Sequence, residues 1–194
     1  MTAIEKFKLI ELYFKLHKRL VANGKFQNLS NKVEESLEKS WFFNNYKVIC
    51  LYNHDSSIPI VRLLADMNNY FKNSFVFPRL EDNKVHLYHV SGPEDLVIDS
   101  FGIIDVVPDL FKVDIDEVDI ILVSGMAFDF DLNVLNIGDN EELYSNFLNK
   151  SKASKYGVCL DCQIYRKGLP ESNYKVDALL NEEGVQIPIG IGDI

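Results

Sequence analysis

IILVSGMAFDFD, which spans Ile120 to Asp131, carries the clearest structural signal in the sequence. A run of β-branched and other apolar residues leads into Gly125, and Asp129 follows directly after an aromatic residue. Such a run is typical of a strand that is buried on both faces. Ligands of open α/β sheets bind beyond the carboxyl ends of the strands. The stretch therefore predicts a buried strand that ends at a binding site, with Asp129 directed toward it.

Helices and strands alternate along the rest of the chain. Runs rich in β-branched and aromatic residues predict strands at 46–52, 74–78, 84–90, 118–125, 156–162 and 175–185, and the second of these is expected to stop at Pro78. Apolar residues at three- and four-residue spacing predict helices at 2–22, 60–71 and 140–151, and another that starts from a cap at Ser30 or Asn31. This order predicts one domain, residues 1–194, with a three-layer α/β/α fold: a mostly parallel sheet with helices on both faces.

The composition narrows the class of protein. The 194 residues are 47% apolar and 25% charged, which is ordinary for a globular domain. The formal net charge of −9 argues against binding to nucleic acid or to an anionic membrane, because phosphate groups attract clustered Lys and Arg. No apolar stretch reaches the roughly eighteen residues of a membrane-spanning helix. The charged N-terminus lacks a secretory signal, and with only three cysteines we expect a cytoplasmic protein with reduced thiols.

Two features of the sequence could carry chemistry. Asp129 could coordinate a hydrated metal ion or hydrogen-bond a ligand, or it could cap the turn after the strand through its own backbone. The residues alone leave both roles open. Cys159 and Cys162 have the spacing of half a zinc site, but no second pair of ligands accompanies them, since His86 and His89 point to opposite faces of a strand. We therefore expect both cysteines to be buried core residues.

The order of these segments resembles the 5-formyltetrahydrofolate cyclo-ligase family, also called methenyltetrahydrofolate synthetases. The resemblance covers the whole chain and runs through VICLYNHDSS (48–57), FVFPRL (75–80), FGIIDV (101–106), DIILVSGMAFD (119–129), YSNFL (144–148) and VDALLNEEGV (176–185). The family's most specific feature is a strand ending in Val-Pro-Gly-x-Ala-Phe-Asp, which here reads Val-Ser-Gly-Met-Ala-Phe-Asp. The resemblance implies the family's fold and its reaction, in which ATP and Mg²⁺ convert 5-formyltetrahydrofolate to 5,10-methenyltetrahydrofolate.

The phosphate-binding loop of the family is altered in this chain. The corresponding stretch reads NVLNIGDNEELYSNFL (133–148), with Val134 in place of the loop arginine and Gly138 as the remaining loop glycine. Asp139, Glu141 and Glu142 add negative charge beside it. Backbone amides cradle phosphate where glycines let the chain approach closely, and carboxylates repel a triphosphate at short range. The loop is therefore poorly suited to ATP.

Other motifs are also reduced. The family's folate-holding Glu and Thr correspond to Ser57 and Ile60, and its N-terminal Lys-x-x-x-Arg keeps Lys6 but has Ile10 at the arginine. For a chain that retains the reaction, the resemblance implies that Lys6 contacts phosphate, that Asp129 lies beside Mg²⁺, and that Gly138 is the remnant of the phosphate cradle. Gly125 and Gln163 complete the expected cofactor-binding set. No catalytic residue is assigned, and Arg62, Arg79 and Arg166 are the cations that could compensate for the missing arginine.

Three functions are consistent with these residues. A working or altered cyclo-ligase would bind nucleotide and hold a metal ion near Asp129. A non-catalytic relative would use the remnant cleft for a small molecule, such as a folate, or for a partner protein. A different metabolic enzyme would reuse the cleft without ATP. If the carboxylates of 139–142 point into the cleft, they count against the first function.

Overall fold

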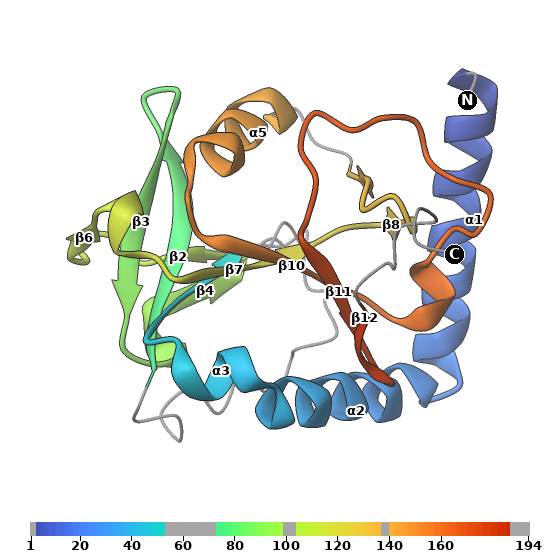
Figure 1. The fold of residues 1–194 in the computed structure, drawn as a ribbon, viewed down its shortest axis with the longest axis horizontal. Coiled ribbons are helices and arrows are strands. Elements are labelled where there is room, and N and C mark those ends of the chain that lie inside the picture. Colours follow the sequence, from blue (N-terminus) through green and yellow to red (C-terminus); the bar gives the residue numbers. More distant parts are fainter. Residues whose placement is uncertain (1–2, 53–72, 99–103, 137–139, 187–194) are drawn as a thin grey trace, which may run out of the picture.

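The computed structural model describes residues 3–52, 73–98, 104–136 and 140–186 (Figure 1). The helix predicted at 60–71 lies outside these ranges, as do Arg62, Gly138 and Asp139. No helix within the described ranges combines the length and the apolarity that a membrane span requires.

A mixed, largely parallel sheet of eight strands forms the centre of the molecule (Figure 1). Its spatial order is β12 (Gly184–Gln186), β11 (Ala178–Asn181), β10 (Ser154–Val158), β7 (Ile120–Ser124), β1 (Val48–Tyr52), β2 (Ser74–Glu81), β3 (Lys84–Val90) and β6 (Lys112–Val113). The five strands from β11 to β2 are parallel, whereas β12, β3 and β6 pair antiparallel at the two sides. The predicted mostly parallel α/β sheet is therefore confirmed.

Two short hairpins lie outside the main sheet. The first pairs β4 (Leu96–Ile98) with β5 (Ile104–Val106), and the second pairs β8 (Ala127–Phe128) with β9 (Val134–Leu135). Single 3-10 turns occur at Pro93–Asp95, Ile115–Glu117 and Asp161–Gln163. The β8–β9 hairpin follows the central strand β7 directly, so it covers the region that the sequence analysis marked as a binding site.

Helices cover both faces of the sheet, as predicted. The helices α2 (Lys25–Lys39) and α3 (Trp41–Asn45) lie on one face and α5 (Glu141–Lys150) on the other, while α1 (Ala3–Ala22) packs against α2 at one end (Figure 1). Successive strand residues serve opposite cores: Ile49 and Leu51 pack on the α2 side, whereas Cys50 and Tyr52 pack on the α5 side. The two-residue period of a strand thus explains why continuous apolar runs such as VICLY are needed here.

Two aspartates tie neighbouring strands together at the amino ends of the parallel strands. Asp119, just before β7, accepts hydrogen bonds from the backbone N–H groups of Lys47 and Val48 at 2.8 and 2.9 Å. Asp177, just before β11, accepts one from the N–H of Lys155 at 2.7 Å. Each carboxylate therefore joins the start of its own strand to the start of the next one in the sheet.

Several predicted boundaries were wrong. The strand β2 continues through Pro78 to Glu81, because β1 pairs with it only as far as Val76 and leaves Pro78 without a partner on that side. Ser30 is not a cap: α2 begins at Lys25, and the Ser30 hydroxyl donates to the Phe26 carbonyl at 2.8 Å. The true boundary is Gly24, whose φ of 65° ends α1 and starts α2.

The C-terminal strand predictions also need correction. The strand predicted at 156–162 is β10, which ends at Val158, and a 3-10 turn follows it. Cys159 is buried as expected, but Cys162 lies on the turn and is exposed. The region 175–185, predicted as a final strand that runs into a turn, contains that strand, β11, and a second strand, β12, that pairs antiparallel with it after the turn.

The α2 core contact can be tested by substitution. Leu37 is fully buried against the sheet, whereas Leu12 on α1 is 60% exposed. We expect Leu37→Ala to lower the free energy of unfolding by about 2–5 kcal/mol, because it removes buried surface and leaves a cavity. Leu12→Ala should change it by less than about 0.5 kcal/mol. Equilibrium denaturation in urea measures both, and equal losses would contradict the burial of α2.

Candidate functional site

The segments that follow the parallel strands meet at the carboxyl edge of the sheet. The strand β1 ends at Tyr52, β7 at Ser124 and β10 at Val158. Residues 125–136 form a loop and hairpin after β7, and residues 159–163 form the turn after β10. An isolated bridge between Phe128 and Ile164 joins these two segments. This edge is the place where α/β proteins bind ligands.

Phe128 packs the β7 hairpin onto the sheet. Its side chain is fully buried, and the ring lies against Gly125 and Gly157. A Cβ atom on Gly157 would lie 2.5 Å from Phe128 Cε1, and one on Gly125 would lie 2.7 Å from Val134 Cγ1. Both distances are too short for a real contact, so the two glycines provide the space that the ring and its neighbour occupy. This packing gives Gly125 a structural role, and its cofactor-binding role stays a prediction.

Asp129 is buried and surrounded by hydrogen-bond donors. Its side chain is 1% exposed, and Oδ1 accepts the backbone N–H of Asn133 at 2.8 Å. Oδ2 accepts the backbone N–H of Leu169 at 2.6 Å and the Asn133 Nδ2 amide at 3.1 Å. A carboxylate offers about four acceptor positions, and three of them are used here. These contacts favour the loop-organising role over the metal role, which stays a prediction.

Gln163 links the two segments of the edge. Its Oε1 accepts the backbone N–H of Leu160 at 2.7 Å, and its Nε2 donates to the Gly125 carbonyl at 2.9 Å. The side chain is 8% exposed, so both ends of the amide are engaged within the protein. Of the predicted site residues, Gly125 and Gln163 are therefore joined by a hydrogen bond, whereas Asp129 is bonded to Asn133 and Leu169. Ligand binding by Gln163 is untested.

Three tyrosines lie beside this network on the α5 side. The rings of Tyr52 and Tyr144 meet edge to face with centroids 5.3 Å apart. The hydroxyl of Tyr174 accepts a hydrogen bond from Asn136 Nδ2 at 2.8 Å. Burial is the main cause that raises the pKa of Tyr52 and of Tyr174. The charge of Glu141 adds a smaller effect in the same direction, so its carboxylate lies near both tyrosines.

The sequence analysis did not select these tyrosines. Tyr52 could have been found as the last residue of a buried strand, in the position where α/β proteins place ligand contacts. Tyr174 and Asn136 are brought together across 38 residues, and no local pattern indicates that contact.

The other predicted residues are spread around the edge. Lys6 is partly buried on α1, seven residues before Tyr13 and so on the same helix face. Tyr13 and Gln163 line a crevice of about 10 Å³ where α1 meets the edge of the sheet. Arg166 is 73% exposed and lies 3.9 Å from Asp161. Within the described ranges, no group of three or more His, Cys, Asp or Glu side chains could hold a metal ion.

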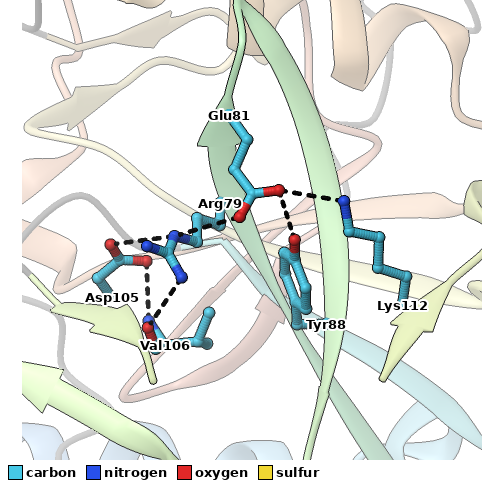
Figure 2. A network of polar contacts seen from close by, with 6 residues as sticks. All are labelled: Arg79, Glu81, Tyr88, Asp105, Val106 and Lys112. Atoms are coloured by element: carbon cyan, nitrogen blue, oxygen red, sulfur yellow. Dashed lines mark hydrogen bonds and ion pairs between the residues drawn. The ribbon is translucent and has the colours of Figure 1, made fainter. Parts of the chain in front are cut away.

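Arg79 belongs to a polar network at the end of β2 (Figure 2). Its Nε lies 3.7 Å from Glu81 Oε1 and 3.6 Å from Asp105 Oδ2. The Tyr88 hydroxyl donates to Glu81 at 2.5 Å, and the Lys112 ammonium donates to it at 3.1 Å. The hydrogen bonds from Tyr88 and Lys112 lower the pKa of Glu81. Two carboxylates thus already neutralise Arg79.

The role of Asp129 can be tested by replacing its carboxylate with an amide. In Asp129→Asn one amide N–H group must face the donors of Asn133 or Leu169, so we expect a loss of about 1–3 kcal/mol in stability. The exposed Asp131→Asn is the control and should be nearly neutral. Thermal unfolding with and without Mg²⁺ distinguishes the two roles. Stabilisation of the unmodified protein by Mg²⁺ that Asp129→Asn abolishes would establish the metal role instead.

The Glu81 network predicts a dependence of stability on pH. The folded-state pKa of Glu81 lies below its usual value of about 4.5. The stabilisation that the ionised Glu81 carboxylate gives to the folded state is therefore complete above about pH 4.5, and it is lost as the pH falls through the folded-state pKa. We expect Glu81→Gln to show a smaller fall in melting temperature between about pH 6 and pH 3 than the unmodified protein. The exposed Glu171→Gln should retain the full fall. An unchanged pH profile in Glu81→Gln would refute this assignment.

Two solved structures match this fold over nearly its whole length. The NMR structure of 5,10-methenyltetrahydrofolate synthetase from Aquifex aeolicus matches with a TM-score of 0.72 and 26% sequence identity, and the match covers 94% of this chain and 96% of that one. The 5,10-methenyltetrahydrofolate synthetase from Mycoplasma pneumoniae matches with a TM-score of 0.68 and 14% identity, over 91% and 98% of the two chains. No protein-family model and no curated protein matches the sequence. By its fold, the chain is therefore similar over nearly its whole length to solved 5,10-methenyltetrahydrofolate synthetases.

Proposed function

We propose that this protein is a divergent cyclo-ligase in which the ATP- and Mg²⁺-dependent conversion of 5-formyltetrahydrofolate to 5,10-methenyltetrahydrofolate is impaired or lost. The observation that carries the proposal is the position of Glu141, which lies with Glu142 in the first turn of α5. Its charge also contributes to raising the pKa of the buried Tyr52 and Tyr174, after the larger effect of burial. A triphosphate bound at the start of α5 would meet this negative charge, and repulsion between like charges is strong at short range.

The start of α5 supports the same conclusion. A helix N-terminus attracts phosphate through its free N–H groups and its dipole. In this protein Glu141 and Glu142 occupy the first turn of α5. These carboxylates already interact favourably with the positive end of the helix, so the helix gains less from a bound phosphate.

Of the arginines proposed to compensate, neither Arg79 nor Arg166 is well placed to bind phosphate. Arg79 is held between Glu81 and Asp105, and Arg166 extends from an exposed loop toward Asp161. A phosphate that recruited Arg79 would have to displace two carboxylates. Lys6 is the cation of the expected set that remains for phosphate.

Mg²⁺ also fits poorly at Asp129. A cation there would compete with two backbone N–H groups and one side-chain amide, each of which directs a positive hydrogen toward the carboxylate. Mg²⁺ requires near-ideal octahedral geometry and keeps several waters. The buried network around Asp129 would have to open to admit them.

A non-catalytic role in binding a small molecule is the second candidate. Tyr144 is half-buried and its ring meets that of the buried Tyr52 edge to face. Aromatic side chains bind planar rings through stacked or edge contacts. A folate or another ring-containing molecule could use this pair of rings without a phosphate site. This candidate predicts ligand binding without turnover.

The experiment that tests the proposal is a direct assay of 5,10-methenyltetrahydrofolate formation by the purified protein with Mg-ATP and 5-formyltetrahydrofolate. We expect no ATP-dependent product. Thermal unfolding should show no shift with Mg-ATP, whereas a ligand at a hundredfold excess over its Kd would add about 2.7 kcal/mol of stability. A shift with 5-formyltetrahydrofolate alone would support the binding role, and ATP-dependent turnover would refute the proposal.

Charge-neutral variants separate the two glutamates. If Glu141 is the group that opposes nucleotide, Glu141→Gln should bind Mg-ATP more tightly than the unmodified protein does. Glu142→Gln, one residue further and exposed, is the matched control and should have a smaller effect. Equal effects from both would mean that general surface charge, rather than a carboxylate in the cleft, opposes the nucleotide.

A further inference from the structure

A separate groove lies between α5 and the β3–β6 side of the sheet. It has a volume of about 480 Å³, which is within the usual range for small-molecule sites. Residues of β3, of the short edge strand β6 and of α5 line the groove, and in Figure 1 α5 lies beside the β2–β3 hairpin.

The groove has an apolar lining because strand residues alternate between faces. Val85 and Leu87 of β3 point to the α5 side, whereas Tyr88 points to the opposite core. Val113 of β6 lies opposite Leu87 in the ladder and belongs to the same side. The apolar lining consists of Val85, Leu87, Val113, Ile115, Leu143 and Phe147.

The α5 wall of the groove is a single stripe of residues along the helix. Leu143, Asn146, Phe147 and Lys150 are spaced at three and four residues and form this stripe. Tyr144 does not line the groove.

The charges around the groove are mostly positive, although the whole chain has a net charge of −9. Lys84 and Lys150 line it, and no carboxylate in the described part of the chain forms an ion pair with either. Lys112 also lines it, but its ammonium binds Glu81. The one acidic lining residue, Asp114, accepts the N–H of Asp116 at 2.9 Å as a helix cap.

We propose that this groove binds a small amphipathic anion, an apolar chain or ring that ends in a carboxylate. The apolar lining would take the body of the molecule, and Lys84 and Lys150 would attract its charged end. A cationic or neutral molecule of the same shape would lack the attraction to Lys84 and Lys150. The site depends neither on ATP nor on the cyclo-ligase reaction, so it can be tested apart from the proposed function.

The test uses decanoate as the probe in isothermal titration calorimetry with the full chain. Decyltrimethylammonium has a similar chain with the opposite charge and serves as the comparison. We expect decanoate to bind and the cation to bind at least tenfold more weakly. Absence of decanoate binding, or equal binding of the two probes, would overturn the proposal.

Two pairs of variants locate the site. Asn146 is exposed on α5 and lines the groove, so Asn146→Trp should fill the groove and abolish decanoate binding. Its control, Asn28→Trp at an exposed position of α2, should leave decanoate binding unchanged. Lys150→Glu should weaken binding at least fivefold, whereas Lys167→Glu, on an exposed loop outside the groove, should not. Melting temperatures confirm that each variant is folded.

Other results would assign the groove differently. Retention of decanoate binding in Asn146→Trp would place the ligand elsewhere and refute the proposal. A dimer in sedimentation velocity that Asn146→Trp disperses would mean that a second copy of the chain occupies the groove, which also refutes it.

Discussion

The ring of Phe128 lies against two glycine backbones, and much of the carboxyl edge depends on that contact. Gly125 follows β7 and Gly157 belongs to β10, so the ring spans two neighbouring strands of the sheet. With Phe128 fixed, the next residue, Asp129, is held where it accepts the N–H of Leu169 from a loop forty residues away. Gln163, through the carbonyl of Gly125, joins the loop after β7 to the turn after β10. The motif Gly-x-Ala-Phe-Asp is therefore explained by packing and hydrogen bonding before any ligand is considered.

The parts of the fold that could be predicted are those with a local cause. The strand β7 is an apolar run, and the apolar residues of the helix α5 recur at three- and four-residue spacing. Both patterns are local, so both elements were predicted close to their true limits. The end of β2 was missed because Pro78 is tolerated only where the neighbouring strand has already stopped, which is a property of β1. Asp129 and Gln163 were correctly placed at the carboxyl edge. Their partners come from distant loops, so the sequence could not show that their polar atoms are already engaged.

The electrostatics of the edge differ from what nucleotide chemistry requires. Transfer of a phosphoryl group needs cations and backbone donors directed at the developing charge. Among the described residues, the charge of Glu141 acts on the buried Tyr52 and Tyr174, while Arg79 is bound to two carboxylates of its own. The sheet is similar to that of solved 5,10-methenyltetrahydrofolate synthetases, but a shared fold does not by itself determine the chemistry of a site.

The two aspartates at the amino ends of the parallel strands, opposite the carboxyl edge, affect how such a protein can evolve. Asp119 and Asp177 hold the first residues of β1 and β10 in line with β7 and β11. A shift of one residue in either pairing would break these bonds and turn every apolar side chain of the strand to the wrong face. Alignment of the strands is therefore secured at the edge opposite the candidate site. Loops at the carboxyl edge can accumulate substitutions, and even exchange one ligand for another, without putting the order of the sheet at risk.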